Sequence, residues 1–401
     1  MKYARPLLLA ASALTLFISA CSQPADIQTP SLEPQFGTAA DDTVVSVAVQ
    51  PGLGNVYVAG EKGRRTYLRQ YNRSGRLNWE RTSAAHSNTY VARTLGADVD
   101  AQGNVYLAYR NDSGTSLVSK LNKNGTLLWR KSFAEFSDMD VDAQGNIYTA
   151  GVFSVRKHTT GGTLVWERNT GVEEYSMLAV AVSPAGNVVA VGDGGGAGGL
   201  LVKYTNGGKE VFRTNSLIFG GPERDNFPGQ LKVGFDETVA LAHTGSFSEG
   251  TGQSVTLQVF DAAGKKLWDD GVIQNSAALP GVDISRGGSI YLTTGHWVCD
   301  GGFDVGEQPG DGVSCTGGSD TDPERSAILT RKYTRGGDVV WSRVLNRGRT
   351  GTDEGTAITV ASDSELYIGG NTVNKVNGVS AGGLDALLAR LDGRGKVIWS
   401  R

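Results

Sequence analysis

The chain has 401 residues, of which 39% are hydrophobic, and this is enough apolar material for a buried core. Its 56 glycines are about twice the usual share, but they follow no three-residue period, so a collagen-like structure is excluded. A formal net charge of −3 gives no overall attraction for nucleic acid, and we expect no nucleic-acid partner. With only 3 methionines and 11 prolines, the composition favours short strands joined by tight turns.

The N-terminus has the features of a secretory signal. Lys2 and Arg5 precede an apolar run from Leu7 to Ile18, which is shorter than an ordinary bilayer span of about 20 residues. Ser-Ala-Cys21 follows the run directly, and Ile18 to Cys21 resembles the lipobox of bacterial lipoproteins, in which the cysteine is acylated. We therefore predict a lipoprotein signal peptide over residues 1–20 and lipidation, of the palmitate type, at Cys21. The alternative is a plain signal peptide with an incidental cysteine.

Residues 21–37 are predicted to form the lipid anchor and an extended tether, because three prolines are spaced through them. Ser22 follows the cysteine, which resembles the sorting signal for the outer membrane in bacteria that have two membranes. We expect an extracytoplasmic protein that is held at the cell envelope by its lipid.

A pattern of glycine and an aromatic residue recurs through the rest of the chain. Seven times an aromatic residue follows a glycine by four positions, and six of the seven tryptophans occupy this place. The glycines are Gly75, Gly125, Gly162, Gly208, Gly264, Gly337 and Gly395. The aromatic residues are Trp79, Trp129, Trp166, Phe212, Trp268, Trp341 and Trp399. Recurrence at a regular spacing indicates a repeat architecture.

Each repeat also contains a hairpin upstream of this pattern. Gly54-Asn55 and Gly103-Asn104 are typical of tight hairpin turns, because both residue types tolerate positive φ. An alternating strand precedes the turn, and two further strands and the strand ending in the aromatic residue follow it. Sheets of four antiparallel strands bury their faces only against neighbouring sheets. We therefore predict an all-β, seven-bladed β-propeller over residues 38–401, with the aromatic residues between blades.

The segments "VSVAVQPGLGNVYVAG" with "YNRSGRLNW", and "MDVDAQGNIYTAG" with "TTGGTLVW", resemble the bacterial seven-bladed β-propeller repeat family of the SBBP type. The resemblance covers residues 38–401 and implies the propeller fold and an extracytoplasmic setting, but no common reaction. The Gly-x-x-x-Trp ending is more distantly similar to quinoprotein-like propeller repeats. Those repeats carry Ala-x-Asp before the glycine turn, whereas this chain has Arg69-Gln-Tyr71 there, so the resemblance does not extend to a quinone cofactor.

Three motif matches have structural explanations. Ser380 lies in a Gly-x-Ser-x-Gly match, but a loop of an all-β repeat lacks the strand-to-helix turn that this nucleophile needs. The glycine-rich segment 194–199 is not followed by a helix that could bind phosphate. Asp138, Asp140 and Asp142 resemble the opening of a calcium loop, but a strand with alternating faces explains them. We predict no catalytic residue and no metal site from these motifs.

Blade one contains an excess of basic residues. Seven lie between Lys62 and Arg81, against one acidic residue, Glu80. The solvated faces of strands explain this excess, and contact with anionic lipid or polysaccharide is the alternative.

The sixth repeat has an insertion at about 296–326, between its second and third strands. It contains Cys299 and Cys315, the two cysteines that remain besides Cys21. In an oxidising compartment such a pair predicts a disulfide.

A binding site is predicted at this insertion. In a propeller the second-to-third connections of adjacent blades emerge on one face, and loops on a rigid scaffold commonly carry binding sites. The candidate binding residues are His243, Trp297, Asp300, Asp304 and Asp311. His243 is included because four other repeats have glycine at its position, which predicts a rim-facing side chain. An aromatic residue flanked by carboxylates suits a cationic or sugar-like ligand or a divalent cation, and a solubilising loop is the alternative. No other cofactor is predicted.

The sequence favours a monomeric, lipid-anchored propeller that acts as a binding or scaffold module for an envelope protein or polysaccharide. The second hypothesis is a propeller-type enzyme (lyase, lactonase or quinoprotein-like) with its site on the elaborated face. An enzyme would need histidines and carboxylates from several blades to converge on the central channel. The chain has 4 histidines and no repeated acid–base pair, which favours binding over catalysis. A third hypothesis is a purely structural envelope component.

Overall fold

A computed structural model describes residues 40–87, 93–170, 176–193, 199–217, 228–246, 253–273, 279–297, 303–304, 314–315, 326–345, 352–373 and 383–401. The described elements are thirty β-strands, and the propeller strands run from Asp42 to Ser400. No helix in these ranges has the length and hydropathy needed to cross a bilayer.

Seven four-stranded sheets account for all but two of the strands. The first three are β1 (Asp42–Val49), β2 (Val56–Lys62), β3 (Arg65–Tyr71), β4 (Leu77–Thr82); β5 (Arg93–Val99), β6 (Val105–Arg110), β7 (Ser116–Leu121), β8 (Leu127–Ser132); and β9 (Asp138–Val141), β10 (Ile147–Gly151), β11 (Ser154–His158), β12 (Leu164–Asn169). The next two are β13 (Ser176–Val182), β14 (Val188–Asp193), β15 (Gly199–Tyr204), β16 (Glu210–Leu217); and β17 (Pro228–Val233), β18 (Val239–Ser246), β19 (Gln253–Phe260), β20 (Lys266–Ile273). The last two are β21 (Gly281–Ile284), β22 (Ile290–Trp297), β25 (Ser326–Tyr333), β26 (Val339–Leu345); and β27 (Asp353–Ser362), β28 (Glu365–Thr372), β29 (Asp385–Asp392), β30 (Val397–Ser400).

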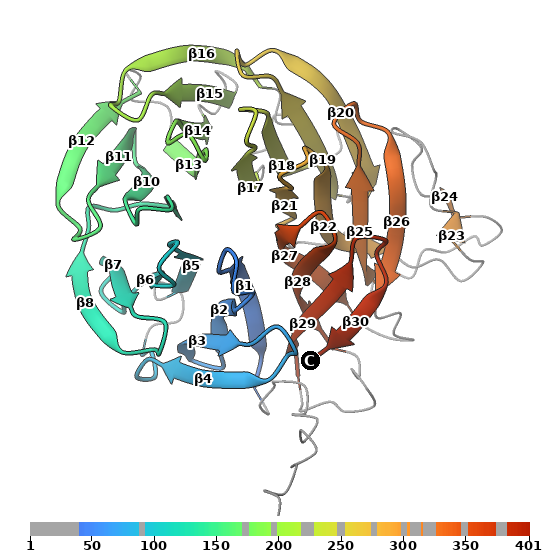
Figure 1. The fold of residues 1–401 in the computed structure, drawn as a ribbon, viewed down its shortest axis with the longest axis horizontal. Helices are drawn as coiled ribbons and strands as arrows, with labels where there is room; N and C mark the ends of the chain where they lie inside the picture. The colour runs from blue at the N-terminus through green and yellow to red at the C-terminus, as the bar shows by residue number, and fades with distance from the viewer. Residues whose placement is uncertain are drawn as a thin grey trace, which may run out of the picture. The chain divides into compact units, whose positions relative to one another are not determined.

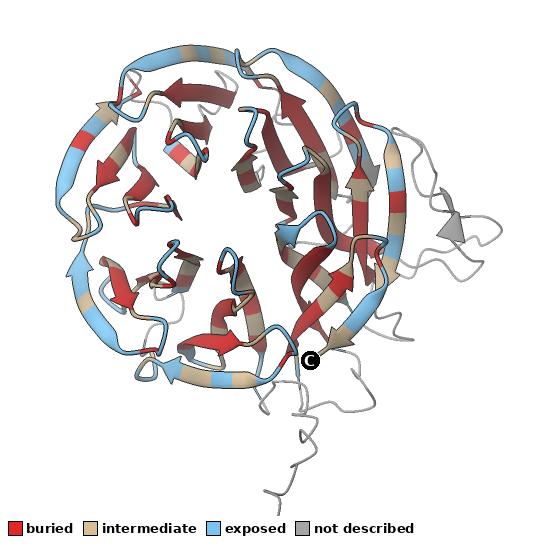
Figure 2. Cartoon of the chain, in the orientation of Figure 1, coloured by how far each residue is buried: buried red, intermediate tan, exposed pale blue. Residues whose placement is uncertain are grey.

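The seven sheets form a ring, each with its strands in chain order from the centre outward, so the prediction of a seven-bladed β-propeller is confirmed (Figure 1). All pairings within the sheets are antiparallel, as in β1–β2 and β28–β29. The inner three strands of the blades are largely buried and the outermost strands are largely exposed (Figure 2). The core therefore consists of apolar layers between neighbouring sheets, as expected for radially packed blades.

The glycine and aromatic pattern joins most blades to the next, but at Gly162 of blade three a Cβ would meet Lys131 and Phe133 of blade two instead of Trp129. Gly395, with φ at 77°, forms the turn before β30, and a Cβ there would lie 3.0 Å from the Trp341 ring of the preceding blade. The Trp341 indole donates a hydrogen bond to Gly393 O at 3.1 Å. Trp79, Trp166, Trp268 and Trp399 make the same kind of hydrogen bond to the next turn. The predicted interblade position is confirmed here, although Trp79 and Trp399 are only half-buried.

A basic residue two positions after the tryptophan strengthens the same joint. Arg81 and Arg401 lie over their own tryptophan rings, at 5.7 and 5.5 Å from the ring centroids. Arg81 Nε donates to Gly125 O at 2.8 Å, and Arg401 Nε donates to Gly75 O at 3.2 Å. In blade five this place is taken by Asp270, which instead accepts a hydrogen bond from the buried Arg331 of blade six at 3.1 Å. This second recurrence was not among the features predicted from the sequence.

The ring closes between blades seven and one without exchange of a strand. Asn371 Oδ1 accepts a hydrogen bond from Val44 N at 2.8 Å, and Thr356 Oγ1 donates to Val44 O at 2.7 Å. Arg401 and Arg73 add the contacts of the outer edge. Side-chain contacts of the ordinary interblade kind therefore complete the ring.

The insertion of blade six lies between β22 and β25. It contains a short antiparallel pair, β23 (Phe303–Asp304) with β24 (Ser314–Cys315), in which Phe303 is opposite Cys315. Cys299 and the Cys315 side chain lie outside the described residues, so the disulfide stays a prediction.

Candidate functional site

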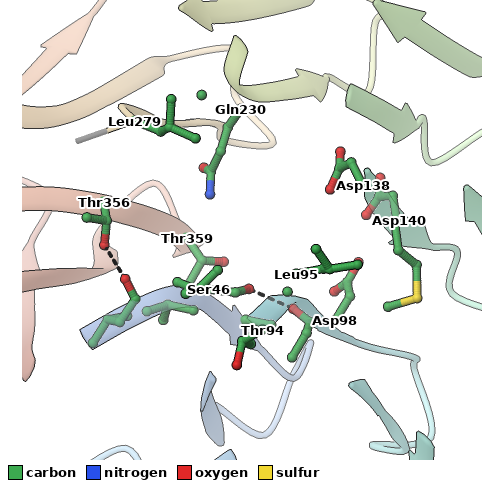
Figure 3. A pocket seen from close by; sticks show the side chains of 18 of the residues that line it. Ser46, Thr94, Leu95, Asp98, Asp138, Asp140, Gln230, Leu279, Thr356 and Thr359 are labelled. Carbon is green, nitrogen blue, oxygen red and sulfur yellow. Dashed lines mark hydrogen bonds between the residues drawn. The ribbon is translucent and has the colours of Figure 1, made fainter. Parts of the chain in front are cut away.

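A cavity of about 570 Å³ lies on the axis of the propeller, among the innermost strands (Figure 3). Strands β1, β5, β9, β13, β17 and β27 all contribute to its wall. Its residues run from the starts of these strands, such as Thr43 and Arg93, to positions near their ends, such as Val49 and Asp98. Thr43 and Arg93 pair with Glu61 and Arg110, at the ends of the second strands. One end of the cavity is therefore at the level where the second-to-third connections leave the sheets.

Carboxylates from neighbouring blades converge in this cavity. Asp98 belongs to β5, and Asp138 and Asp140 belong to β9 (Figure 3). Lys232 of β17 also lines it, and its ammonium lies 3.9 Å from Asp140 Oδ1. Asp283 of β21 is close enough to Lys232 for their charges to interact. Four carboxyl groups thus surround one ammonium group.

The backbone of the next blade holds each of these carboxylates in place. Asp98 Oδ2 accepts a hydrogen bond from Val141 N at 3.2 Å. Asp138 and Asp140 accept hydrogen bonds from the N–H groups of Val180 and Val182, at 2.9 and 2.7 Å. Asp283 makes the corresponding bond to blade seven, at 2.7 Å. Because the strands fix these bonds, the acidic groups are preorganised before any ligand enters.

Asp98 and Asp140 form a carboxyl pair. Their carboxyl groups interact through both charge and a hydrogen bond. Burial raises the pKa of Asp98 well above its ordinary value, and the charge of Asp140 raises it further. The charge of Asp140 also raises the pKa of Lys232, so the ammonium stays charged. The ammonium group of Lys232 therefore offsets part of the carboxylate charge.

Asp138→Asn is expected to stabilise the protein more at pH 7.5 than at pH 5. Burial raises the pKa of Asp138 to about 6, so the folded protein binds the Asp138 proton more tightly than the unfolded chain does. The protonated carboxyl group therefore stabilises the wild type at low pH, and this stabilisation is lost as the pH rises through about 6. By linkage, the stability difference between variant and wild type should shrink by about 1 kcal/mol from pH 7.5 to pH 5. Urea unfolding at both pH values measures it. A difference that is independent of pH would contradict the raised pKa.

The stability difference between Asp138→Asn and the wild type is the useful quantity, because buried histidines change the stability with pH in the opposite direction. Burial lowers the pKa of His158 and of His243 to about 4. A histidine whose pKa is lowered by folding contributes its full stability when the pH is above the ordinary histidine pKa, and this contribution is lost as the pH falls toward the lowered pKa. Both histidines are unchanged in Asp138→Asn, so their effect cancels.

Asp138, Asp140 and Asp142, which resemble the opening of a calcium loop, have other roles in the structure. Asp142 Oδ1 accepts hydrogen bonds from Gln144 N and Asn146 N, and its Oδ2 accepts one from the Tyr148 hydroxyl. In the described part of the chain, no three His, Cys, Asp or Glu side chains are grouped so that they could hold a metal ion. Asp138 and Asp140, which the sequence suggested were strand residues only, instead line the cavity.

His243 is buried within β18 and does not face the rim, so this part of the prediction is wrong. The reason lies in the glycine positions with which it was compared. At Gly60, Gly151 and Gly370 a Cβ would lie 1.9, 2.4 and 2.5 Å from a backbone oxygen of the segment leading into or forming the innermost strand. Glycine is used there because the backbone approaches closely, not because the position is exposed. A binding role for His243 stays a prediction.

The other predicted binding residues belong to the insertion. Trp297 ends β22, and Asp304 is in β23. The side chains of both, together with Asp300 and Asp311, lie outside the described residues. Asp98, Lys232 and Asp283 were missed, although a charged residue two positions before the first turn of a blade was a visible signal.

Comparisons with known proteins support the fold. No protein-family model matches the sequence, and no curated protein matches it. The solved structure of the Dos1 propeller is similar over 88% of this chain and 94% of that chain, with 10% identity and a TM-score of 0.52. A protein of unknown function from Bacteroides caccae covers 57% of this chain and 82% of its own, with 17% identity and a TM-score of 0.41. KlHsv2 with loop 6CD replaced by a Gly-Ser linker is similar over 90% of this chain and 99% of that chain, with 9% identity and a TM-score of 0.45.

The chain is thus a seven-bladed β-propeller, as its sheet order and its likeness to the Dos1 propeller agree. At these identities the likeness shows the fold and nothing about activity.

Proposed function

We propose that this protein is a lipid-anchored binding module of the cell envelope, which receives a cationic group of a protein or polysaccharide partner in its axial cavity. The observation that carries the proposal is the cavity of about 570 Å³ with its preorganised carboxylates. Concave sites with a few convergent polar groups are where ligands usually bind. The lipobox-like sequence ending at Cys21 supports the location.

The charge balance of the cavity supports an organic cation as the ligand group. Four carboxyl groups and one ammonium group leave an excess of negative charge, even when one of the carboxyl groups is protonated. A lysine or arginine side chain of a protein, or an amino group of a sugar, has the extended charged shape that fits.

Isothermal titration calorimetry of the full chain with spermidine tests this proposal. We expect saturable binding that Asp98→Asn/Asp140→Asn abolishes, because asparagine keeps the hydrogen-bond acceptor but removes the charge. Asp269→Asn/Asp338→Asn, which removes two exposed carboxylates of the outer edge, is the matched control and should bind as the wild type does. Equal losses in both variants, or no binding to the wild type, would reject the cavity as a cation site. Calcium chloride is the second titrant, and tighter calcium binding would overturn the choice of an organic cation.

Cys21→Ser is expected to move the protein from the membrane fraction to the soluble fraction. Two or three acyl chains hold a protein firmly, since each buried methylene contributes about 0.8 kcal/mol. Fractionation and mass spectrometry of the mature N-terminus measure the outcome. An unchanged distribution, with no acyl chain on the wild-type protein, would show that the anchor is absent.

The insertion of blade six supports a second part of the partner-binding surface. Trp297 ends β22, and Asp300, Asp304 and Asp311 follow it in the sequence before β25 begins. Deleting residues 299–315 should reduce cross-linking to the partner in intact cells. The melting temperature of the propeller should change little, because the disulfide predicted there would close only a surface loop.

A propeller-type enzyme, such as a lyase or lactonase, is the second candidate function. The observation that favours it is the Asp98–Asp140 pair, because a carboxyl group with a raised pKa beside a second carboxyl group can supply a general acid and a general base. The described residues that line the cavity include no histidine. Turnover of a lactone or a uronate polymer that Asp140→Asn abolishes would favour the enzyme over the binding module.

A further inference from the structure

The turns and outermost strands of three consecutive blades carry most of the basic charge of the outer edge. Residues 72–82, 122–132 and 392–401, in blades one, two and seven, contain nine Lys or Arg and two Asp or Glu. The equivalent segments of the other blades, residues 159–169, 205–215, 261–271 and 334–344, contain seven basic and six acidic residues. The basic charge is therefore concentrated on one side of a protein whose net charge is −3.

These three segments form one continuous surface, which we call the basic rim. A Cβ at Gly75 would lie 3.0 Å from the Trp399 ring, and a Cβ at Gly125 would lie 2.8 Å from the Trp79 ring. Each turn therefore packs on the outermost strand of the preceding blade. Figure 1 shows the outermost strands β30, β4 and β8 following one another around the ring.

Several cations of the basic rim are free to meet an anion. Arg76, Lys123, Arg394 and Lys396 are exposed. Arg76 and Lys123 form no ion pair with the residues that the structure describes. Arg394 and Lys396 are close enough to Asp392 for their charges to interact with it. By contrast, Arg73 is held by Glu365. Unpaired ammonium and guanidinium groups on one surface attract anionic phosphate groups, which Arg binds through two hydrogen bonds.

The same surface exposes apolar side chains. Leu127 and Leu128 are 49% and 51% exposed, and Val397 and Ile398 are 38% and 48% exposed. They lie on the outermost strands, which Figure 2 shows as mostly exposed. Half-buried tryptophans, including Trp129, accompany them. Basic residues interleaved with aliphatic side chains and tryptophan are typical of surfaces that bind at a lipid interface.

From this combination we propose that the basic rim of blades seven, one and two rests on an anionic phospholipid membrane. A soluble polyanion would engage the charges but would leave the aliphatic side chains exposed. The described chain begins at Ala40, next to β1 of blade one, which is the middle blade of the basic rim.

Binding to lipid vesicles tests the proposal, with the full-length Cys21→Ser chain so that no acyl chain contributes. The Cys21→Ser protein, with its basic rim unchanged, should bind phosphatidylcholine vesicles that contain phosphatidylglycerol. It should not bind vesicles of pure phosphatidylcholine. The variant Arg76→Glu/Lys123→Glu/Lys396→Glu should bind the anionic vesicles at least about tenfold more weakly. Leu128→Ser/Ile398→Ser, which keeps every charge, should also weaken binding.

The matched control reverses three exposed lysines at the turns of blades four and five, in Lys209→Glu/Lys265→Glu/Lys266→Glu. It should bind nearly as the wild type does. Equal weakening by both triple variants would overturn the proposal, because binding would then follow net charge. Binding to dextran sulfate but not to anionic vesicles would assign the surface to a polysaccharide instead. Thermal melts of each variant separate loss of binding from loss of folding.

Discussion

Gly60→Ala is expected to destabilise the propeller by about 3 kcal/mol or more. The new Cβ would lie 1.9 Å from Thr43 O, so the innermost strand β1 would have to move away from β2. Tyr67 would be displaced as well, because its hydroxyl donates to Thr43 O at 3.0 Å. Since β1 also lines the axial cavity, the shift should change the cavity and not only the stability.

Urea unfolding followed by tryptophan fluorescence measures this effect. Gly271→Ala is the matched control, because a Cβ at Gly271 would meet no atom within 4 Å. The control should unfold within about 0.5 kcal/mol of the wild type. Equal stability of the two variants would show that β1 and β2 are not packed as described.

Trp341→Ala is expected to cost about 3 kcal/mol, the lower part of the range for a buried tryptophan. The side chain is 9% exposed, packs on the Gly395 turn of blade seven and donates a hydrogen bond to Gly393 O. Tyr291 adds an edge-on ring contact with centroids 6.2 Å apart. Removing the indole leaves a gap between blades six and seven and an unpaired turn carbonyl.

Val340→Ala provides the comparison, because Val340 precedes the tryptophan and is 50% exposed. It should change the free energy of unfolding by no more than about 0.5 kcal/mol. If Trp341→Ala were equally mild, the aromatic residue would not connect the blades.

The parts of the fold that could be predicted are those that recur in every blade. A turn such as that at Gly75 needs positive φ, and the wedge between blades needs an aromatic side chain such as Trp399, so both residues repeat. Four-stranded sheets and the number of blades follow from that recurrence. His243 was misread because its position shows a steric requirement of the backbone, which only the register of β17 and β18 reveals.

The candidate site could not be predicted in the same way, because it consists of differences between blades. One position of the innermost strand is occupied by Ala48, Asp98, Asp140, Ala181, Lys232, Asp283 and Thr359 in successive blades. A search for recurrence passes over such a position. Its charges gain meaning only when the ring brings Asp98 and Asp140 together and places Lys232 beside them. The strand alternation that explained Asp138 and Asp140 was correct, but it did not show which face met the axis.

The most direct test of the binding function is a crystal structure of the protein with spermidine bound. The account predicts an ammonium group in the axial cavity within hydrogen-bond distance of Asp98 or Asp140, and no corresponding density in Asp98→Asn/Asp140→Asn crystals grown in the same solution. Spermidine found only on the outer surface, with the cavity unchanged between the two crystals, would contradict it.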